Sequence, residues 1–279
     1  EMLDGKWPRA CEGCRQNEKD GLESKRLYES KRFNTDFESL RRQTLADGGL
    51  LEPKLEFIEL RLGNKCNLKC RTCNPHSSIA WQTEYKSLEE TLPFVQHYPA
   101  IQVEWCESEA FWQDLEKHLC PEPRFYINGG EPTFIEAHWN FLEQLIERQR
   151  SSNIELFYNS NMTHLPEKAF ILWKNFKKVS VSASIDDIGD RNHYIRYPAS
   201  WKKIEMHVAK ILDHGLILDV TQTVSAMNLF YLDEMLAWAQ TRKIHVEYNF
   251  VYDPPFLAPK ALPQVVRKEL LKNEKFQTM

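Results

Sequence analysis

A chain of 279 residues is long enough for one large domain or two smaller ones, and its 42% hydrophobic content can supply a sizeable core. Its 36 basic and 40 acidic residues give a net charge of −4 without any run of lysine and arginine, which argues against a nucleic-acid partner. The sequence contains no apolar stretch of about 18 residues, so no membrane partner is expected. Because the chain begins at Glu1 and its last residues are a charged, helix-like run, we expect it to be part of a longer protein.

The first 53 residues are predicted to form a small metal-binding segment and a linker. They contain Cys11-Glu12-Gly13-Cys14, and a Cys-x2-Cys pair is a moderate signal for a metal site. Residues 17–33 are mostly charged and are compatible with a helix. Residues 35–53 contain Asp47-Gly48-Gly49 and Pro53, which predicts a turn-rich connection and a domain boundary near residue 53.

From residue 54 to residue 279, strand-like and helix-like patterns alternate. The strand-like runs are rich in valine, isoleucine, phenylalanine and tyrosine, and they are residues 55–62, 124–128, 154–159, 178–184, 216–224 and 244–251. Helical periodicity fills the intervals; Trp201, Ile204 and Val208, for example, recur on one helix face that Gly215 can cap. This alternation predicts an α/β fold with a parallel sheet and right-handed crossovers. Residues 93–123, with three prolines, are expected to be an insertion.

Polar residues follow every predicted strand. Asn128 ends the second strand and Asn161 follows the third. Ser182 and Ser184 lie in the fourth strand, and Asp186 follows it. In parallel β/α arrays the active site lies at the carboxyl ends of the strands. We therefore expect a functional site at this edge of the sheet.

Three cysteines follow the first predicted strand at the spacing Cys-x3-Cys-x2-Cys. Cys66, Cys70 and Cys73 can hold three corners of a cubane iron–sulfur cluster, and clusters held wholly by protein take four cysteines. The loop therefore predicts one iron open to a small molecule. A structural zinc site is the alternative, but zinc takes four protein ligands in such sites. The chain has seven cysteines and no secretion signal, a combination that is typical of reduced, metal-binding cysteines. We therefore expect a cytoplasmic protein.

Gly129-Gly130-Glu131-Pro132 follows the second predicted strand and is therefore a neighbour of the cysteine loop. Two glycines allow a close backbone approach to a ligand, and the carboxylate of Glu131 can hold an ammonium group. The alternative is an ordinary tight turn. Its position beside the three cysteines favours ligand binding.

The cysteine loop, the Gly-Gly-Glu-Pro turn and the six-fold rhythm closely resemble the radical S-adenosylmethionine enzymes over about residues 54–260. The resemblance implies a partial TIM-type (β/α)6 parallel barrel and a [4Fe-4S] cluster whose open iron binds S-adenosylmethionine. It also implies that residues 129–132 receive the methionine ammonium. The remaining cofactor contacts that it implies are Ser182 or Ser184 for the ribose, Arg196 for a carboxylate, and Asn161 near the cofactor. Thr72 departs from the aromatic residue or methionine that the family often has there.

The segment around Cys11 and Cys14 resembles the twitch module, a shortened SPASM module of radical S-adenosylmethionine proteins. The matching positions are Trp7, Cys11, Cys14, Glu18, Gly21, Ser24 and Arg26. The resemblance implies a second, auxiliary iron–sulfur cluster, and this module usually follows the barrel rather than preceding it. A zinc site and an unused cysteine pair remain alternatives. Cys106 and Cys120 are expected to be buried small hydrophobic residues.

The function that this resemblance implies is reductive cleavage of S-adenosylmethionine to a 5′-deoxyadenosyl radical that abstracts hydrogen from a substrate, for which a peptide or protein is the first choice. An electron donor of the flavodoxin or ferredoxin type would be the protein partner. One alternative is a non-catalytic iron–sulfur or zinc module that serves as an electron carrier or scaffold. Another is a radical S-adenosylmethionine enzyme that modifies RNA. The excess of acidic over basic residues makes this alternative less favoured.

Overall fold

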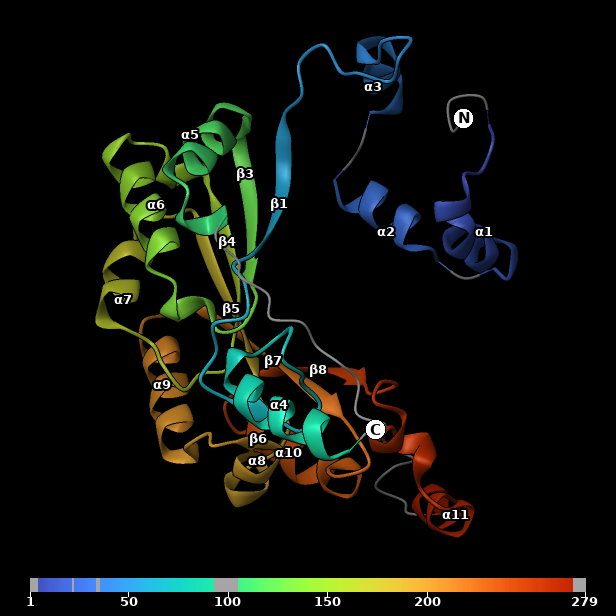
Figure 1. The fold of residues 1–279 in the computed structure, drawn as a ribbon. Helices are drawn as coiled ribbons and strands as arrows, with labels where there is room; N and C mark the ends of the chain where they lie inside the picture. Colours follow the sequence, from blue (N-terminus) through green and yellow to red (C-terminus); the bar gives the residue numbers. More distant parts are fainter. Residues whose placement is uncertain (1–4, 22, 34–35, 93–104, 273–279) are drawn as a thin grey trace. The chain divides into compact units, whose positions relative to one another are not determined.

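The computed structural model describes residues 5–21, 23–33, 36–92 and 105–272, and the chain forms two compact units (Figure 1). The first unit is Glu1–Lys54 and the second is Leu55–Met279. Of the described residues, no helix is both long and apolar enough to cross a membrane.

The first unit is helical. Its helices are α1 (Glu12–Lys19), α2 (Lys25–Arg32) and α3 (Phe37–Gln43). The helix predicted within residues 17–33 is therefore divided between the end of α1 and the whole of α2. The hydroxyl of Ser24 caps α2 by accepting a hydrogen bond from the N–H of Leu27.

The expectation of a turn-rich connection over residues 35–53 was wrong for its first part, which is helix α3. The carboxylate of Asp36 caps α3 by accepting hydrogen bonds from the N–H groups of Glu38 and Ser39. An aspartate at this position is a helix-start signal. The turn with Asp47 follows α3, and an isolated bridge between Thr44 and Leu50 closes it.

The second unit contains a six-stranded, wholly parallel sheet in the order β1-β3-β4-β5-β7-β8, with β1 and β8 at its two edges. Its strands are β1 (Leu55–Arg61), β3 (Leu119–Asn128), β4 (Glu155–Ser160), β5 (Lys178–Ser184), β7 (Ile217–Val224) and β8 (His245–Phe250). This open, partial barrel confirms the expected α/β fold class and the six predicted strands.

The helices of the second unit lie between the strands and after β8, and some of them cover the outer face of the sheet. They are α4 (Gln82–Thr91), α5 (Glu109–Lys117), α6 (Glu136–Glu147), α7 (Glu167–Trp173), α8 (Gly189–Ile195), α9 (Trp201–Asp213), α10 (Leu232–Gln240) and α11 (Gln264–Lys272). Figure 1 shows α6, α7 and α9 in succession along that face. The indoles of Trp139 and Trp173 lie 6.2 and 5.0 Å from the ring of Tyr158 on β4, so an aromatic cluster anchors α6 and α7 to the sheet.

Side chains alternate along the strands between a fully buried outer set and a half-exposed inner set. On β7, Leu218, Val220 and Gln222 are buried, whereas Thr221 and Thr223 are half-buried on the inner face. A strand places successive side chains on opposite faces, so the polar alternate positions line the inside of the partial barrel. The polar residues noted at the strand ends therefore meet at one end of this inner face.

Strand β3 begins five residues earlier than predicted. Its first half contains Pro121 and Pro123, and the register with β1 slips between Leu55 and Phe57. Proline lacks an N–H donor and is tolerated where the ladder is irregular. Of residues 93–123, expected as an insertion, the structure describes 105–123, and these contribute α5, the start of β3 and the buried Trp112 to the core.

A short antiparallel ribbon was not anticipated from the sequence. It pairs β2 (Lys69–Cys70), inside the cysteine loop, with β6 (Arg196–Tyr197), which follows α8. The pairs are Lys69 with Tyr197 and Cys70 with Arg196. This ribbon attaches the cysteine loop to the segment that follows β5.

Candidate functional site

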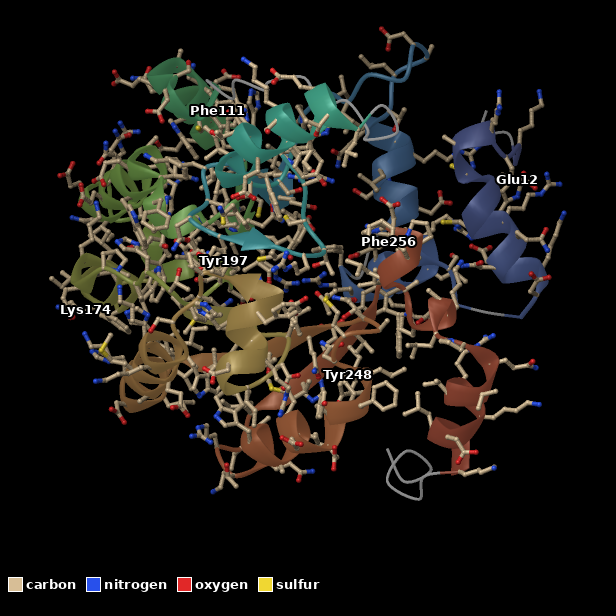
Figure 2. All side chains as sticks on the ribbon, turned by 60° about the horizontal axis from the view of Figure 1, so that its bottom comes forward. Glu12, Phe111, Lys174, Tyr197, Tyr248 and Phe256 are labelled. Carbon is tan, nitrogen blue, oxygen red and sulfur yellow. The ribbon has the colours of Figure 1, made fainter. Side chains whose placement is uncertain are left out.

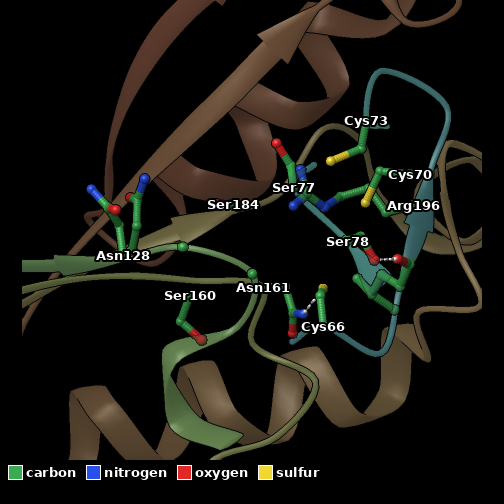
Figure 3. Close-up of a pocket in the computed structure, with 14 residues that line it drawn as sticks. Cys66, Cys70, Cys73, Ser77, Ser78, Asn128, Ser160, Asn161, Ser184 and Arg196 are labelled. Carbon is green, nitrogen blue, oxygen red and sulfur yellow. Dashed lines mark hydrogen bonds between the residues drawn. The ribbon is translucent and has the colours of Figure 1, made fainter. Parts of the chain in front are cut away.

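A cavity of about 120 Å³ lies at the carboxyl ends of the strands (Figure 3). Its lining residues come from the cysteine loop, the ends of β3, β4 and β5, and the ribbon: Cys66, Leu68, Cys70, Cys73, Ser77, Ser78, Asn128, Gly129, Gly130, Asn159, Ser160, Asn161, Ser184 and Arg196. The structure thus brings together on one cavity three cysteines, the two glycines, Asn161, Ser184 and Arg196.

The cysteine loop is held in shape by polar contacts of its own. The hydroxyl of Ser78 donates to the carbonyl of Leu68 at 2.5 Å, and the amide of Asn64 donates to the carbonyl of Pro75 at 3.0 Å. The indole N–H of Trp81 donates to the carbonyl of Cys70 at 3.2 Å. These contacts fix the backbone around the thiols. Sequence reasoning missed Asn64 and Ser78 because their partners are backbone carbonyls ten or more residues away.

All three thiols of the loop have raised pKa values. Burial raises the pKa of Cys70 to about 12, although the guanidinium of Arg196 opposes that shift. Burial also raises the pKa of Cys66 and of Cys73, and the N–H groups of Leu68 and Asn74 oppose the shift. A metal must therefore displace protons from these sulfurs when it binds.

Gly129 and Gly130 are required by the close approach of the cysteine loop. Both have positive φ, +92° and +53°. A Cβ atom on Gly130 would lie 2.4 Å from the carbonyl oxygen of Lys65, and one on Gly129 would lie 2.8 Å from the carbonyl of Gly63. The backbone N–H of Glu131 also donates to Lys65 at 2.9 Å. The glycines thus seat the turn against the loop, in addition to lining the cavity.

Glu131 is fully buried, and other parts of the chain already bond to both of its carboxylate oxygens. The N–H of Asn161 donates to one oxygen at 2.6 Å, and the hydroxyls of Thr133 and Ser160 donate to the other at 2.8 and 3.0 Å. Burial raises the pKa of this carboxyl, and these hydrogen bonds oppose the shift. The carboxylate joins the end of β3 to the end of β4. Pro132, next in the chain, is buried at the start of a 3-10 turn.

Asn161 connects the end of β4 to the first cysteine. Its amide donates to the sulfur of Cys66 at 3.7 Å (Figure 3). It also donates to the side-chain oxygen of Asn67 at 3.1 Å. The two serines of β5 differ: Ser184 lines the cavity, whereas the hydroxyl of Ser182 lies 2.6 Å from that of Thr221 on β7. The structure therefore favours Ser184 over Ser182 as the residue that faces the cavity.

Arg196 lies between the cysteines and a buried aspartate. Its Nη1 donates to Oδ2 of Asp186 at 3.0 Å, and its Nε is buried without a hydrogen-bond partner in the described part of the chain. Burial opposes its charge, but Asp186, Cys70 and Cys73 hold the pKa of Arg196 above its ordinary value. Figure 3 shows its guanidinium on the side of the cavity where Cys70 and Cys73 lie.

Asp186 is bonded through every polar group that it has. Its Oδ1 accepts from the N–H of Thr223 at 3.0 Å, and its N–H donates to Asn192 at 3.1 Å. Its carbonyl accepts from the side-chain amides of Gln222 and Asn228 at 2.8 and 2.7 Å. This network orients the carboxylate that holds Arg196.

Of the residues singled out in the sequence, Glu131, Pro132 and Ser182 lie outside the cavity lining. Three titratable residues close in sequence to the site also lie outside it. His76 and His193 are exposed, and Asp187 is buried and paired with Arg191 at 3.0 Å. Cys106 and Cys120 are both buried, as expected for small hydrophobic residues.

In the first unit, Cys11 and Cys14 are half-buried at the start of α1. Near them, Arg26 pairs with Glu18 at 2.7 Å, the hydroxyl of Ser24 donates to Glu18 at 2.6 Å, and the guanidinium lies 5.1 Å from the ring of Trp7. Arg26 is also close enough to both cysteines for their charges to raise its pKa, after the larger effect of Glu18. The residues of this sequence motif thus gather around one arginine.

The cavity presents three thiols, the type of donor that holds an iron–sulfur cluster. Among the described residues, no three His, Cys, Asp or Glu side chains gather closely enough to hold one metal ion. The three thiolates of a cubane bind three different irons, so they stand farther apart than the ligands of one ion. The orphaned Nε of Arg196 and the Gly-Gly backbone on the same cavity supply polar groups for a small ligand beside such a cluster.

No family model matches the chain, and no curated protein sequence matches it significantly. Solved structures do match. Native anSMEcpe with bound AdoMet and the Cp18Cys peptide superposes with a TM-score of 0.50 at 19% identity, over 70% of this chain and 50% of that one. Native anSMEcpe with bound AdoMet gives the same score at 21% identity and the same coverage. SuiB of Streptococcus suis bound to S-adenosylmethionine matches with a TM-score of 0.49 at 14% identity, over 88% of this chain and 53% of that one.

The chain spans about half the length of these solved structures. At such low identity the match to anSMEcpe concerns the fold, and the fold agrees with the six parallel strands and the cavity at their carboxyl ends. The second unit therefore has the partial-barrel fold of the radical S-adenosylmethionine enzymes, the family that its sequence motifs resemble.

Proposed function

We propose that this chain is a radical S-adenosylmethionine enzyme with its catalytic centre in the second unit. The observation that carries this proposal is the convergence of Cys66, Cys70 and Cys73 with the Gly129-Gly130 backbone and Arg196 on one cavity. The cofactor pair implied by the family supplies one-electron reductive cleavage of S-adenosylmethionine to a 5′-deoxyadenosyl radical, which takes a hydrogen atom from the substrate.

Different residues of the site would hold the iron–sulfur cluster and S-adenosylmethionine. The three thiolates hold three irons, and the proton that each thiol loses on binding makes loading favourable at higher pH. The Gly129-Gly130 backbone would receive the methionine ammonium, and Glu131, which lies outside the cavity lining, would support that turn. Because both oxygens of Glu131 are bonded within the protein, we expect it to act chiefly by shaping the turn and by its charge.

The other proposed cofactor contacts are Arg196, Ser184 and Asn161, which line the same cavity. We propose that the guanidinium of Arg196 binds the methionine carboxylate, because its buried Nε has no hydrogen-bond partner among the described residues and can donate to that group. Ser184 is the serine placed for the ribose. Ser182 would have to give up its contact with Thr221 to take that role. Asn161 orients Cys66 through its amide.

The substrate that we propose is a peptide or protein side chain. The anSMEcpe structure that matches this fold contains a bound peptide, and the first unit carries the twitch-like motif around Arg26. We propose that Cys11 and Cys14 contribute to an auxiliary cluster. An electron donor of the flavodoxin or ferredoxin type is required for turnover, and reduced thiolates are most readily maintained in the cytoplasm.

The test is anaerobic reconstitution with iron and sulfide, followed by dithionite and S-adenosylmethionine. We expect four irons with equal acid-labile sulfide in the second unit's site and formation of 5′-deoxyadenosine. Cys70→Ala should abolish that product, whereas Cys120→Ala, which removes a buried thiol outside the cavity, should retain it. Product from Cys70→Ala, or one zinc and no sulfide in the purified protein, would refute the proposal.

A further inference from the structure

The segments that enclose the cysteine loop are basic, although the whole chain has a net charge of −4. Residues 60–83 contain Arg61, Lys65, Lys69 and Arg71 and no aspartate or glutamate. Residues 191–204, which supply the other strand of the ribbon, contain Arg191, Arg196, Lys202 and Lys203 and likewise no acidic residue. Three of these cations pair with acidic residues from outside the two segments: Lys69 with Glu84, Arg191 with Asp187 and Arg196 with Asp186. The exposed positive charge at the ribbon itself therefore comes chiefly from Arg71.

The ribbon of β2 and β6 has two chemically different faces. Cys70 and Arg196 form one cross-strand pair and line the cavity. Lys69 and Tyr197 form the next pair, and side chains alternate along a strand, so they project from the opposite face. Tyr197 is 43% exposed, which places it at the surface. Figure 2 labels Tyr197 next to the ribbon.

Cations stack on aromatic rings across this outer face. The guanidinium of Arg71 lies 4.8 Å from the ring centre of Tyr194, and its Nε donates to the Tyr194 carbonyl at 3.3 Å. The ammonium of Lys69 lies 5.5 Å from the ring of Tyr197 and also pairs with Glu84 of α4. Tyr194 is 58% exposed. We call Lys69, Arg71, Tyr194 and Tyr197 the outer ribbon face.

The outer ribbon face lies directly over a cysteine of the cavity. Lys69 and Arg71 flank Cys70 in the chain, and Cys70 is buried on the inner side of the same two-stranded ribbon. The half-buried indole of Trp81 donates to the carbonyl of Cys70 and contacts Tyr85 edge-on at 5.5 Å. Only the thickness of the ribbon separates this surface from a proposed cluster ligand.

We propose that the outer ribbon face is the docking surface for an acidic one-electron carrier protein. This inference rests on the proposed function, because it assigns the electron entry of the same site. Opposite charges steer two proteins together and fix their relative orientation. Arginine and tyrosine are enriched at the centres of protein interfaces. In the step itself, the carrier is oxidised by one electron and the cluster is reduced by one, and no bond is formed or broken.

The first test measures binding without turnover. A fluorescently labelled acidic flavodoxin is titrated with the full chain, as purified, at low and at physiological salt. We expect the Kd to rise with salt, because charge pairs at a surface are screened. Arg71→Glu should weaken binding by about tenfold or more at low salt. Lys174→Glu makes the same charge change at an exposed site that Figure 2 shows well apart from Tyr197, and it should change the Kd less than twofold.

The second test measures reduction of the reconstituted cluster, followed by its loss of visible absorbance. Arg71→Glu should slow reduction by flavodoxin hydroquinone by about tenfold and leave reduction by dithionite unchanged, since a small reductant needs no docking surface. If Arg71→Glu lowers the iron content, Arg71→Ala takes its place in both tests, with a smaller loss expected in the same direction.

Equal flavodoxin Kd values for the Arg71 and Lys174 variants would overturn the inference. So would loss of tRNA binding by Arg71→Glu with an unchanged flavodoxin Kd, which would assign the face to nucleic acid. The two proposals fail separately. A chain that cleaves S-adenosylmethionine with dithionite but does not bind flavodoxin at this face keeps the proposed function and loses the docking surface, whereas a chain without a cluster loses the proposed function.

Discussion

Arg196 on the ribbon and Asp186 after β5 form a buried ion pair, with 3.0 Å between Nη1 and Oδ2. The aspartate is itself held by backbone and side-chain groups of β7 and of the residues that follow it. The ion pair therefore fixes the guanidinium of Arg196, beside Cys70 and Cys73, relative to the carboxyl ends of the strands.

Replacing Asp186 with asparagine should destabilise the protein strongly. The change keeps the side-chain shape but leaves the buried Arg196 without its counter-charge, and loss of one partner from a buried ion pair costs about 3–5 kcal/mol. We expect the free energy of unfolding in urea at pH 7 to fall by about 3 kcal/mol. The matched control is Glu167→Gln, whose carboxylate pairs with Lys210 at the surface and should contribute less than about 1 kcal/mol. Similar losses in the two variants would contradict the role assigned to Asp186.

Replacing Gly130 with alanine should disturb the contact between the Gly-Gly-Glu-Pro turn and the cysteine loop. The new Cβ would lie 2.4 Å from the Lys65 carbonyl, so the loop or the turn must move. Gly215→Ala is the control, because Gly215 also has a positive φ (+68°) but has nothing within 4 Å of the added Cβ. Both variants bear the cost of a left-handed alanine, about 1–2 kcal/mol. We expect Gly130→Ala to lose about 1–3 kcal/mol more and to bind less iron on reconstitution; equal unfolding midpoints and iron contents would contradict this.

The buried His138 should make the protein sensitive to mild acid. Burial lowers the pKa of His138 to about 3, whereas its ordinary value is 6.5. Because the folded-state pKa is depressed, its contribution to stability is complete above pH 6.5 and is lost as the pH falls from 6.5 toward 3. The expected slope is at most about 1.4 kcal/mol per pH unit.

The measurement for His138 is the free energy of unfolding in urea at pH 7, 6 and 5 for the wild type and for His138→Gln. The glutamine can still occupy the site beside the Ile135 carbonyl, which His138 Nδ1 approaches at 2.6 Å, but it does not titrate in this range. The variant should therefore show a shallower decline in stability over these pH values. Parallel curves for the two proteins would show that His138 does not cause the acid sensitivity.

Most of the sheet was predictable because its signals are local. The strand β5 has the predicted bounds, and the other five strands of the six-stranded sheet differ from prediction chiefly at their ends. Helix α3 was not predicted because it is only seven residues long and its capping residue, Asp36, is a type that is also common in turns. The first half of β3 was missed because Pro121 and Pro123 resemble loop residues, and their place in a strand depends on an irregular register with β1.

The gathering of the site was also predictable, because parallel strands bring their carboxyl ends to one edge. The contacts within it were not. The ribbon pairs Cys70 with Arg196, and Arg71 bonds to Tyr194 across 123 positions of sequence. The glycines of the turn were expected to make room for a ligand, and in the structure they also make room for the carbonyls of Gly63 and Lys65. Such requirements arise from two segments packing together and leave no periodic pattern in either one.

The sequence by itself determined the parallel sheet, the three thiols and the polar residues at the strand ends, since residue type, spacing and alternation act over a few positions. Only the tertiary structure decided how each polar group is used. It bonds both oxygens of Glu131 within the protein, pairs Ser182 with Thr221, leaves Ser184 on the cavity, and orients Arg196 through Asp186. The physical reason is that burial and hydrogen-bond partners depend on which distant segments meet, and those contacts exist only in the folded chain.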